Sequence, residues 1–166
     1  MIYCSMKQVE WEKIKLIISD FDGVMTDNRV MVDEDGRESV YVSRADGQAV
    51  HILRNLGIEL VIMSTETNGV VGKRAQKLGV ECVQSIHDKA KCLKEYCEHR
   101  NILLDNVAYI GNDINDYEAM KLARVKIVPQ DAYEEVKQIA DYITTVSGGY
   151  GVIREVAGLI SNHMEE

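Results

Sequence analysis

Five short segments of the chain are mainly apolar and rich in Ile and Val. Apolar runs of this length, bounded by polar residues, are typical of parallel strands that are buried on both faces of a sheet. The pattern therefore predicts five strands, over residues 14–19, 60–63, 80–83, 107–110 and 125–128.

Apolar residues at helical spacing fill the stretches between these runs. One stripe ends before Gly57 and another before Gly79, and glycine is a common residue just past the end of a helix. We predict helices around residues 49–56, 70–78, 92–97 and 136–140, and a last one over 152–161. The alternation of strands and helices predicts an α/β fold built on a doubly wound parallel sheet with right-handed crossovers.

Residues 30–42 depart from this alternation. Asp33, Glu34, Asp35 and Gly36 have the composition of a tight turn between two short strands. We therefore predict a short β-hairpin after the first strand. Neither the hairpin segment nor the stretch from residue 64 to 89 leaves room for a separate cap domain. Residues 1–166 are interpreted as a single domain.

Composition narrows the class of protein. The chain has 166 residues, of which 46% are hydrophobic, enough for one sizeable core. It has no apolar run of about 18 residues, and its first residues are too polar for a signal peptide. These features predict a cytoplasmic protein in which the cysteines are reduced thiols, namely Cys4, Cys82, Cys92 and Cys97.

The formal net charge of −8 disfavours nucleic acid and anionic membranes as partners, because both need a concentrated basic surface. An acidic protein that acts on an anionic small molecule needs local positive charge. A divalent cation held by carboxylates supplies such a charge.

Polar residues follow the predicted strands at the points where each one ends. In an open α/β sheet, the ligand crevice forms outside the carboxyl ends of the strands. Each polar residue alone fits an ordinary turn, cap or exposed charge. Together, carboxylates, a hydroxyl and an ammonium group can bind a metal ion and a phosphoryl group. The sets are Asp20-Phe21-Asp22-Gly23, Ser64-Thr65-Glu66, Asp88-Lys89 and Gly111-Asn112-Asp113-Ile114-Asn115-Asp116.

In this order, the motifs Asp20-x-Asp22-Gly23, Ser64, Lys89 and Gly111-x-Asp113-x-x-Asp116 resemble those of the haloacid dehalogenase superfamily over nearly the whole chain. The resemblance implies a Rossmann-like phosphatase core. It implies that Asp20 attacks phosphorus and forms an aspartyl-phosphate, and that Asp22 acts as general acid and base. Ser64, the Thr65 backbone N–H and Lys89 would hold the phosphoryl oxygens.

The same resemblance implies Mg²⁺ as the cofactor. Its ligands would come from Asp20, the backbone carbonyl of Asp22, and the last motif through Asn112 and Asp113, with Asp116 supporting them. The related sugar-acid phosphatases commonly have Asp where this chain has Asn112. The Asn side chain still offers a carbonyl oxygen, but it removes one negative charge from the metal site.

Within the superfamily, the chain is similar to the capless branch. That branch includes 3-deoxy-manno-octulosonate 8-phosphate phosphatases, acylneuraminate 9-phosphate phosphatases and the C-terminal domains of some acylneuraminate cytidylyltransferases. The resemblance is carried by Ala45-Asp46-Gly47, by Ser64-Thr65-Glu66, by residues 111–116 and by residues 148–155.

Two residues near the predicted site distinguish between the possible substrates. The octulosonate enzymes generally carry Arg where this chain has Glu66 and Ala45. The resemblance therefore favours a nine-carbon acylneuraminate-type 9-phosphate, with the eight-carbon octulosonate 8-phosphate as the alternative. The substrate would then be met by Thr65, Glu66, Asp46, Arg74 and Lys77, although Arg74 and Lys77 also fit an exposed helix face.

Two other classes of protein compete with an enzyme of this kind. A phosphoacceptor receiver domain has similar site chemistry, but its acceptor Asp follows a later strand than Asp20 does. A non-catalytic domain that serves a sugar-acid cytidylyltransferase in oligomerisation or regulation is the stronger competitor. A magnesium-dependent phosphate-release assay separates these possibilities.

A homotetramer is expected from the hairpin and from the resemblance, since capless members assemble around this element. An isolated two-stranded hairpin is marginal in water, so Val30, Val32, Val40 and Val42 are expected to bury one face against neighbouring hairpins. The glycine-rich residues 148–151 would approach a ligand, and Arg154 would supply a cation at a neighbour's pocket. A plain loop before the last helix fits the same residues.

Overall fold

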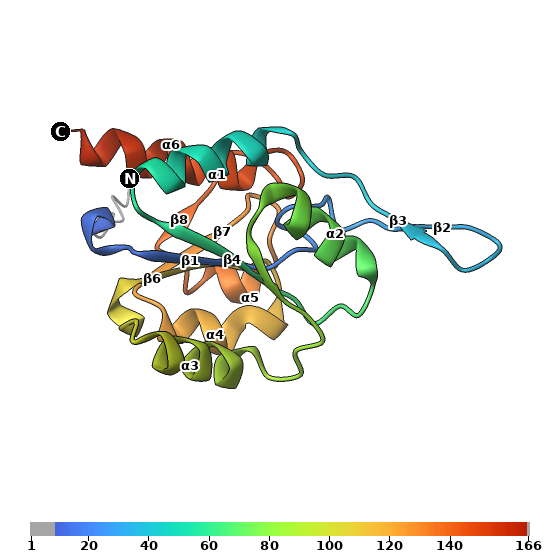
Figure 1. The fold of residues 1–166 in the computed structure, drawn as a ribbon, viewed down its shortest axis with the longest axis horizontal. Coiled ribbons are helices and arrows are strands. Elements are labelled where there is room, and N and C mark those ends of the chain that lie inside the picture. The colour runs from blue at the N-terminus through green and yellow to red at the C-terminus, as the bar shows by residue number, and fades with distance from the viewer. Residues whose placement is uncertain (1–8, 166) are drawn as a thin grey trace.

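The computed structural model describes residues 9–165, and its central element is a six-stranded parallel sheet with the strand order β5-β4-β1-β6-β7-β8 (Figure 1). β1 pairs with both β4 and β6, which places the first strand in the middle of the sheet. The five predicted strands are confirmed. The strands are β1 (Leu16–Ser19), β4 (Glu59–Met63), β5 (Glu81–Val83), β6 (Val107–Ile110), β7 (Val125–Val128) and β8 (Tyr142–Ile143).

Helices cover both faces of this sheet, as Figure 1 shows. One face is covered by α1 (Ala45–Asn55), α2 (Gly69–Leu78) and α6 (Val152–Met164), and the other by α3 (Lys89–Arg100), α4 (Tyr117–Leu122) and α5 (Glu134–Lys137). Short 3₁₀ turns are η1 (Trp11–Lys13), η2 (Leu104–Asn106) and η3 (Ile114–Asp116). The doubly wound α/β fold is therefore confirmed.

The strand β1 shows how the sequence specifies this layering. All four of its residues are buried, with Ile17 in the core under α1 and α6 and with Leu16 and Ile18 in the core on the other side. Successive side chains of a strand point to opposite faces, so a strand buried on both sides must be mainly apolar, and the one polar residue of β1, Ser19, donates its hydroxyl proton to the Asp20 carbonyl. This is the reason that its run is uninterrupted rather than alternating.

The helix ends follow local capping chemistry. The Asn68 side chain accepts a hydrogen bond from the backbone N–H of Val70 at the start of α2, and Asp88 does the same for Lys91 at the start of α3. α2 ends at Gly79, whose φ of 68° is a left-handed conformation that glycine adopts without strain. The predicted end of this helix at Gly79 is confirmed.

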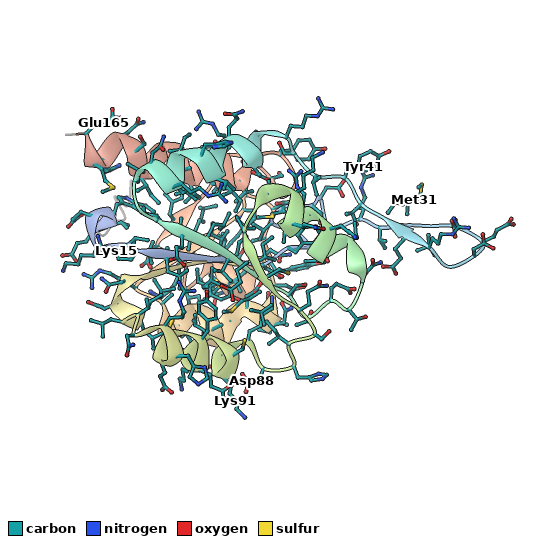
Figure 2. The ribbon with its side chains drawn as sticks, viewed as in Figure 1. Lys15, Met31, Tyr41, Asp88, Lys91 and Glu165 are labelled. Atoms are coloured by element: carbon teal, nitrogen blue, oxygen red, sulfur yellow. The ribbon has the colours of Figure 1, made fainter. Side chains whose placement is uncertain are left out.

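The predicted hairpin consists of β2 (Met31–Val32) and β3 (Glu38–Ser39). It projects from the body of the domain, and Figure 2 shows Met31 and Tyr41 on this projection, far from Glu165. Met31 is 63% exposed and Tyr41 is 79% exposed. Within residues 9–165 the hairpin is the only element between β1 and α1, so the described chain carries no cap domain.

The four valines of the hairpin differ in their surroundings within the chain. Val40 and Val42 pack against the core of their own chain, because the returning strand enters α1 there. Val30 and Val32 are exposed.

Other expectations can be checked in part. Cys82, Cys92 and Cys97 are free thiols, whereas Cys4 lies outside the described residues. None of the helices in residues 9–165 has the length and apolar character needed to cross a bilayer.

Candidate active site

The ends of the parallel strands bring the polar motifs together around one small cavity. Its volume is about 110 Å³, and a second cavity of about 210 Å³ adjoins it toward the hairpin, sharing Asp22, Asn28 and Glu66. The convergence of the strand-end motifs is thus confirmed. The smaller cavity is lined by Asp20, Asp22, Asn28, Ser64, Thr65, Glu66, Asn112, Asp113 and Asn115.

A buried cluster of three charged side chains includes Asp20, which lines this cavity, together with Lys89 and Asp116 behind it. The Lys89 ammonium contacts Asp20 Oδ1 at 2.9 Å and Asp116 Oδ1 at 2.7 Å. Burial raises the pKa of Asp20, and the Asp116 carboxylate raises it further, while Lys89 lowers it. The net result is a pKa of Asp20 raised to about 7, and the Lys89 ammonium is the contact that favours the ionised form that a nucleophilic carboxylate needs.

The two carboxylate oxygens of Asp20 differ in their contacts. Oδ1 accepts hydrogen bonds from the Phe21 backbone N–H, at 2.7 Å, and is the oxygen that Lys89 contacts. No donor within residues 9–165 contacts Oδ2. The side chain is thus held by one oxygen, and the other is available to a metal ion or to phosphorus.

Asp116 organises the last motif. Its Oδ1 also accepts a hydrogen bond from the Tyr109 hydroxyl at 3.0 Å, and its Oδ2 accepts one from the Asn112 backbone N–H at 3.0 Å. Any side chain at Gly111 would overlap that of Asp116. Glycine is therefore required next to this carboxylate. The Asp116 carboxylate binds both Lys89 and the backbone of the loop that carries Asn112. Tyr109 is a supporting residue that the sequence did not single out, because it lies inside an apolar run.

Asp22 lies at the junction of the two cavities and is about half-buried. Its Oδ1 accepts a hydrogen bond of 3.1 Å from the Thr26 hydroxyl. Burial raises the pKa of Asp22, and the charges of Glu66 and Glu38 add to this effect, whereas the Thr26 hydrogen bond opposes it. A carboxyl group with a raised pKa is suited to donate a proton to a leaving group.

Ser64 is buried at the end of β4 and presents its hydroxyl to the cavity. Its Oγ accepts a hydrogen bond from the Glu66 backbone N–H at 3.1 Å. A hydroxyl has one proton to donate and two acceptor positions, so this contact leaves the proton of Ser64 free for a phosphoryl oxygen. Thr65 and Glu66 are exposed and line the same cavity.

The residues present fit a magnesium ion. Asn112 is buried, and its Oδ1 has no hydrogen-bond partner, an arrangement that a buried carbonyl oxygen rarely has unless an ion or water completes it. It lines the cavity together with Asp20, Asp22 and Asp113. The described residues contain no group of three or more His, Cys, Asp or Glu with metal-ligand geometry. The candidate set instead combines carboxylates with an amide oxygen and a backbone carbonyl, all hard oxygen ligands of the kind Mg²⁺ prefers.

Three residues expected to contact the substrate do not line either cavity. Asp46 is buried between α1 and α6. Burial raises the pKa of Asp46, and the backbone N–H groups at the start of α6 and the charge of Arg74 lower it by a smaller amount. Arg74 donates a hydrogen bond from Nη2 to the Ser43 carbonyl at 2.7 Å. Lys77 is exposed on α2. Asp46 and Arg74 thus lie away from both cavities, and among the described residues the two carboxylate oxygens of Asp46 and Nε of Arg74 are buried without a hydrogen-bond partner.

The glycine-rich segment 148–151 packs against its own chain and lines neither of the two cavities. The Gly149 N–H donates to the Val24 carbonyl at 3.0 Å, and a side chain at Gly148 would overlap the Gly23 carbonyl. The segment therefore supports the loop after Asp20 from behind. Arg154 follows on α6 and is exposed, beside Tyr150 in a groove that is separate from both cavities.

Comparison with known proteins decides the family. Residues 64–156 match the sequence profile of the haloacid dehalogenase-like hydrolases. The 3-deoxy-D-manno-octulosonate 8-phosphate phosphatase KdsC of Salmonella typhi is 31% identical over 150 residues, which cover 90% of this chain and 80% of that protein. The chain belongs to the haloacid dehalogenase-like hydrolase family.

Solved structures of other members of this hydrolase family share the fold. A chain of Streptomyces avermitilis described as a HAD family hydrolase is 42% identical, with a TM-score of 0.86 over 89% of this chain and 84% of that one. The octulosonate 8-phosphate phosphatase of Moraxella catarrhalis, in complex with magnesium, phosphate and KDO, is 33% identical, with a TM-score of 0.88 over 92% of this chain and 88% of that one. The present haloacid dehalogenase-like hydrolase is thus an enzyme of the phosphatase type without a cap.

Proposed function

We propose that this hydrolase is a magnesium-dependent phosphatase that acts on a phosphorylated 3-deoxy sugar acid, with the eight-carbon octulosonate 8-phosphate as the substrate. The observation that carries the proposal is the buried contact of Lys89 with Asp20 and Asp116, beside Asp22 and Ser64 in one cavity. This set provides a nucleophile, an acid and two donors to phosphoryl oxygens. When bound at Asn112, Asp113 and the first motif, Mg²⁺ would offset the repulsion between the nucleophile and the phosphate.

The reaction divides into two displacements at phosphorus. In the first, the free Asp20 oxygen forms a bond to phosphorus as the bond to the sugar oxygen breaks, and Asp22 gives its proton to that sugar oxygen. In the second, water attacks the aspartyl-phosphate, its proton passes to Asp22, and the bond from phosphorus to Asp20 breaks. Ser64 and Lys89 donate to the phosphoryl oxygens in both steps, where negative charge is shared among them.

The relatives support the eight-carbon substrate rather than the nine-carbon 9-phosphate that Glu66 and Ala45 indicated. KdsC of Salmonella typhi and the Moraxella catarrhalis enzyme both act on the octulosonate ester by name. Identities near 30% are compatible with a change at these two residues, of which Glu66 lines both cavities and Ala45 lines neither. The nine-carbon ester is therefore an outcome that the substrate test must be able to detect.

One positively charged residue in the lining of the cavities, Arg29, supports a substrate that carries a carboxylate over a neutral sugar. Among the described residues that line the two cavities, Arg29 is the only cation, whereas Asp20, Asp22, Glu38, Glu66 and Asp113 are acidic. The other nearby cation, Lys89, is buried against Asp20 and Asp116. The Arg29 side chain is 80% exposed, and Asp27 holds the guanidinium through two contacts of 2.7 and 2.9 Å. Arg29 is the residue that we assign to the carboxylate of the substrate.

Phosphate release from three esters tests this proposal: the eight-carbon 8-phosphate, a nine-carbon 9-phosphate and a neutral hexose 6-phosphate. We expect the highest kcat/KM for the eight-carbon ester, and an Arg29→Ala variant should raise KM about tenfold for the sugar acids only. Arg37→Ala is the matched control, because Arg37 lies on the same hairpin and contacts only its turn. A tenfold preference for the nine-carbon ester, about 1.4 kcal/mol, would overturn the choice of substrate.

A non-catalytic role in a cytidylyltransferase assembly is the second candidate. The substitution of Asn112 for the usual Asp favours it, because that substitution removes one charge from the metal site. The free Oδ1 of Asn112 and the intact Asp20 and Asp22 argue for a working site. Absence of phosphate release from every ester in the presence of Mg²⁺ would favour the non-catalytic role.

We also propose a homotetramer assembled through the hairpin. Its exposed Val30, Met31 and Val32 are adjacent apolar residues on a projecting two-stranded element. Such an element is marginal alone, and contact with neighbouring hairpins would cover these side chains.

A further inference from the structure

Thr26 is a fully buried threonine in the loop that follows the proposed nucleophile. Its hydroxyl contacts three groups. It accepts hydrogen bonds from the backbone N–H groups of Gly23 and Asn28, each at 3.2 Å, and it donates to Asp22 Oδ1 at 3.1 Å. No motif marks this residue in the sequence, because a single threonine after an apolar pair fits many loops.

The hydrogen-bond capacity of the hydroxyl fixes the direction of its proton. A threonine oxygen has two acceptor positions and one proton. Because Gly23 and Asn28 occupy both acceptor positions, the proton points to Asp22. No other donor within the described chain contacts the Asp22 side chain, so the orientation of this carboxyl group depends on Thr26.

Thr26 itself is held rigidly by segments that are far apart in the sequence. Its backbone forms a β-bridge with Val42 at the base of the hairpin. On the other side, Gly148 and Gly149 pack so closely against Gly23, Thr26 and Asp27 that a side chain on either glycine would overlap backbone atoms. The Thr26 hydroxyl therefore has a fixed position beside the half-buried Asp22 carboxyl, which lines both cavities.

From this geometry we propose that Thr26 is a positioning residue for proton transfer by Asp22. It holds Oδ1 of Asp22, which leaves Oδ2, without a hydrogen-bond partner in the described chain, as the oxygen that carries the proton for the leaving group in the cavities that Asp22 lines. The inference rests on the proposed phosphatase function and deepens it. It assigns to Thr26 the placement of the proton that Asp22 gives to the leaving oxygen as the phosphorus–oxygen bond breaks.

The dependence of the rate on the leaving group separates positioning of the acid from a general structural role. A sugar alkoxide leaves only with a proton, whereas p-nitrophenolate leaves readily without one. The value of kcat/KM covers the steps up to the first phosphoryl transfer. It is therefore sensitive to the transfer of the proton from Asp22 to the leaving oxygen. The experiment compares the octulosonate 8-phosphate with p-nitrophenyl phosphate in saturating Mg²⁺.

Thr26→Val keeps the shape of the side chain and removes the hydroxyl. We expect kcat/KM for the sugar ester to fall roughly 10- to 100-fold, a part of the contribution that general acids make, and to fall less than about threefold for p-nitrophenyl phosphate. Thr26→Ser, which keeps the donor, should restore the sugar ester rate to within about threefold of wild type. Mg²⁺ affinity should be the same in both variants.

Equal losses on both substrates, or no rescue by serine, would refute the positioning role. If Thr26→Val does not fold, Thr26→Cys supplies a weaker donor of similar size, and it should show the same selectivity at smaller magnitude. Adding the Thr26 change to Asp22→Asn should cause no further loss on the sugar ester, and an additional loss would count against the inference. A wild-type protein that hydrolyses neither ester would overturn the proposed function as well.

Discussion

The Asp116→Asn variant removes one negative charge from the buried cluster while keeping the size of the side chain. In the wild type, Oδ1 accepts from Lys89 at 2.7 Å and from Tyr109 at 3.0 Å, and Oδ2 accepts from the Asn112 N–H at 3.0 Å. An amide has only one oxygen. Whichever way it turns, its NH₂ group faces donors and leaves at least one of them unpaired.

The expected loss follows from these contacts. A hydrogen bond to a charged group contributes about 1.5–3 kcal/mol, and a buried donor left unpaired costs about 1–3 kcal/mol. Relief of the repulsion between Asp116 and Asp20, which raises the pKa of Asp20, offsets part of this loss. We therefore expect the free energy of unfolding to fall by about 2–4 kcal/mol. Because Lys89 loses one of its two partners, kcat/KM should fall roughly 100-fold.

Urea denaturation with EDTA present measures this change without a contribution from metal binding, and an unchanged m-value shows that the comparison is valid. Glu118→Gln is the control, because Glu118 lies on the adjoining helix and makes only an exposed contact with Lys121. The control should change stability by less than about 0.5 kcal/mol. If Asp116→Asn is equally mild, the three-residue cluster does not hold the site together.

Three further changes have defined outcomes. Asn112→Asp should preserve or tighten Mg²⁺ binding in calorimetry, and a large loss of affinity would exclude Asn112 as a ligand. Burial raises the pKa of Asp46 to about 6 in the folded state, so its ionisation costs stability as pH rises from 4 to 7. Asp46→Asn should therefore gain roughly 2–3 kcal/mol over the wild type across that range in unfolding curves, and a constant difference would contradict this. Light scattering should give a tetramer that Val32→Asp dissociates, and a fully active wild-type monomer would exclude assembly through the hairpin.

Much of the fold was predictable because buried parallel strands require apolar runs. The exceptions have a physical reason. β8 has only two residues and α4 only six, so neither is long enough to show a period. The loop after β1 was also missed as a structural unit, because its shape depends on glycines 148 and 149, which lie more than 100 residues away in the sequence.

The candidate site was predictable where topology alone determines position, at strand ends such as those before Asp20 and Ser64. It was not predictable where the direction of a side chain decides. Asp46 is one helix position from an exposed turn, yet it points into the interface with α6. Thr26 and Tyr109 contribute through hydroxyl groups whose partners are visible only in three dimensions.

The central claim is that Asp20 forms a covalent bond to phosphorus in a magnesium-dependent reaction. Phosphate release from the octulosonate 8-phosphate, measured with Mg²⁺ and with EDTA, tests it most directly in the wild type and in Asp20→Asn. The account predicts turnover by the wild type with Mg²⁺ alone, and no turnover by Asp20→Asn, which should remain folded and still bind the ester. Near-normal phosphate release by Asp20→Asn, or release by the wild type that EDTA does not reduce, would contradict it.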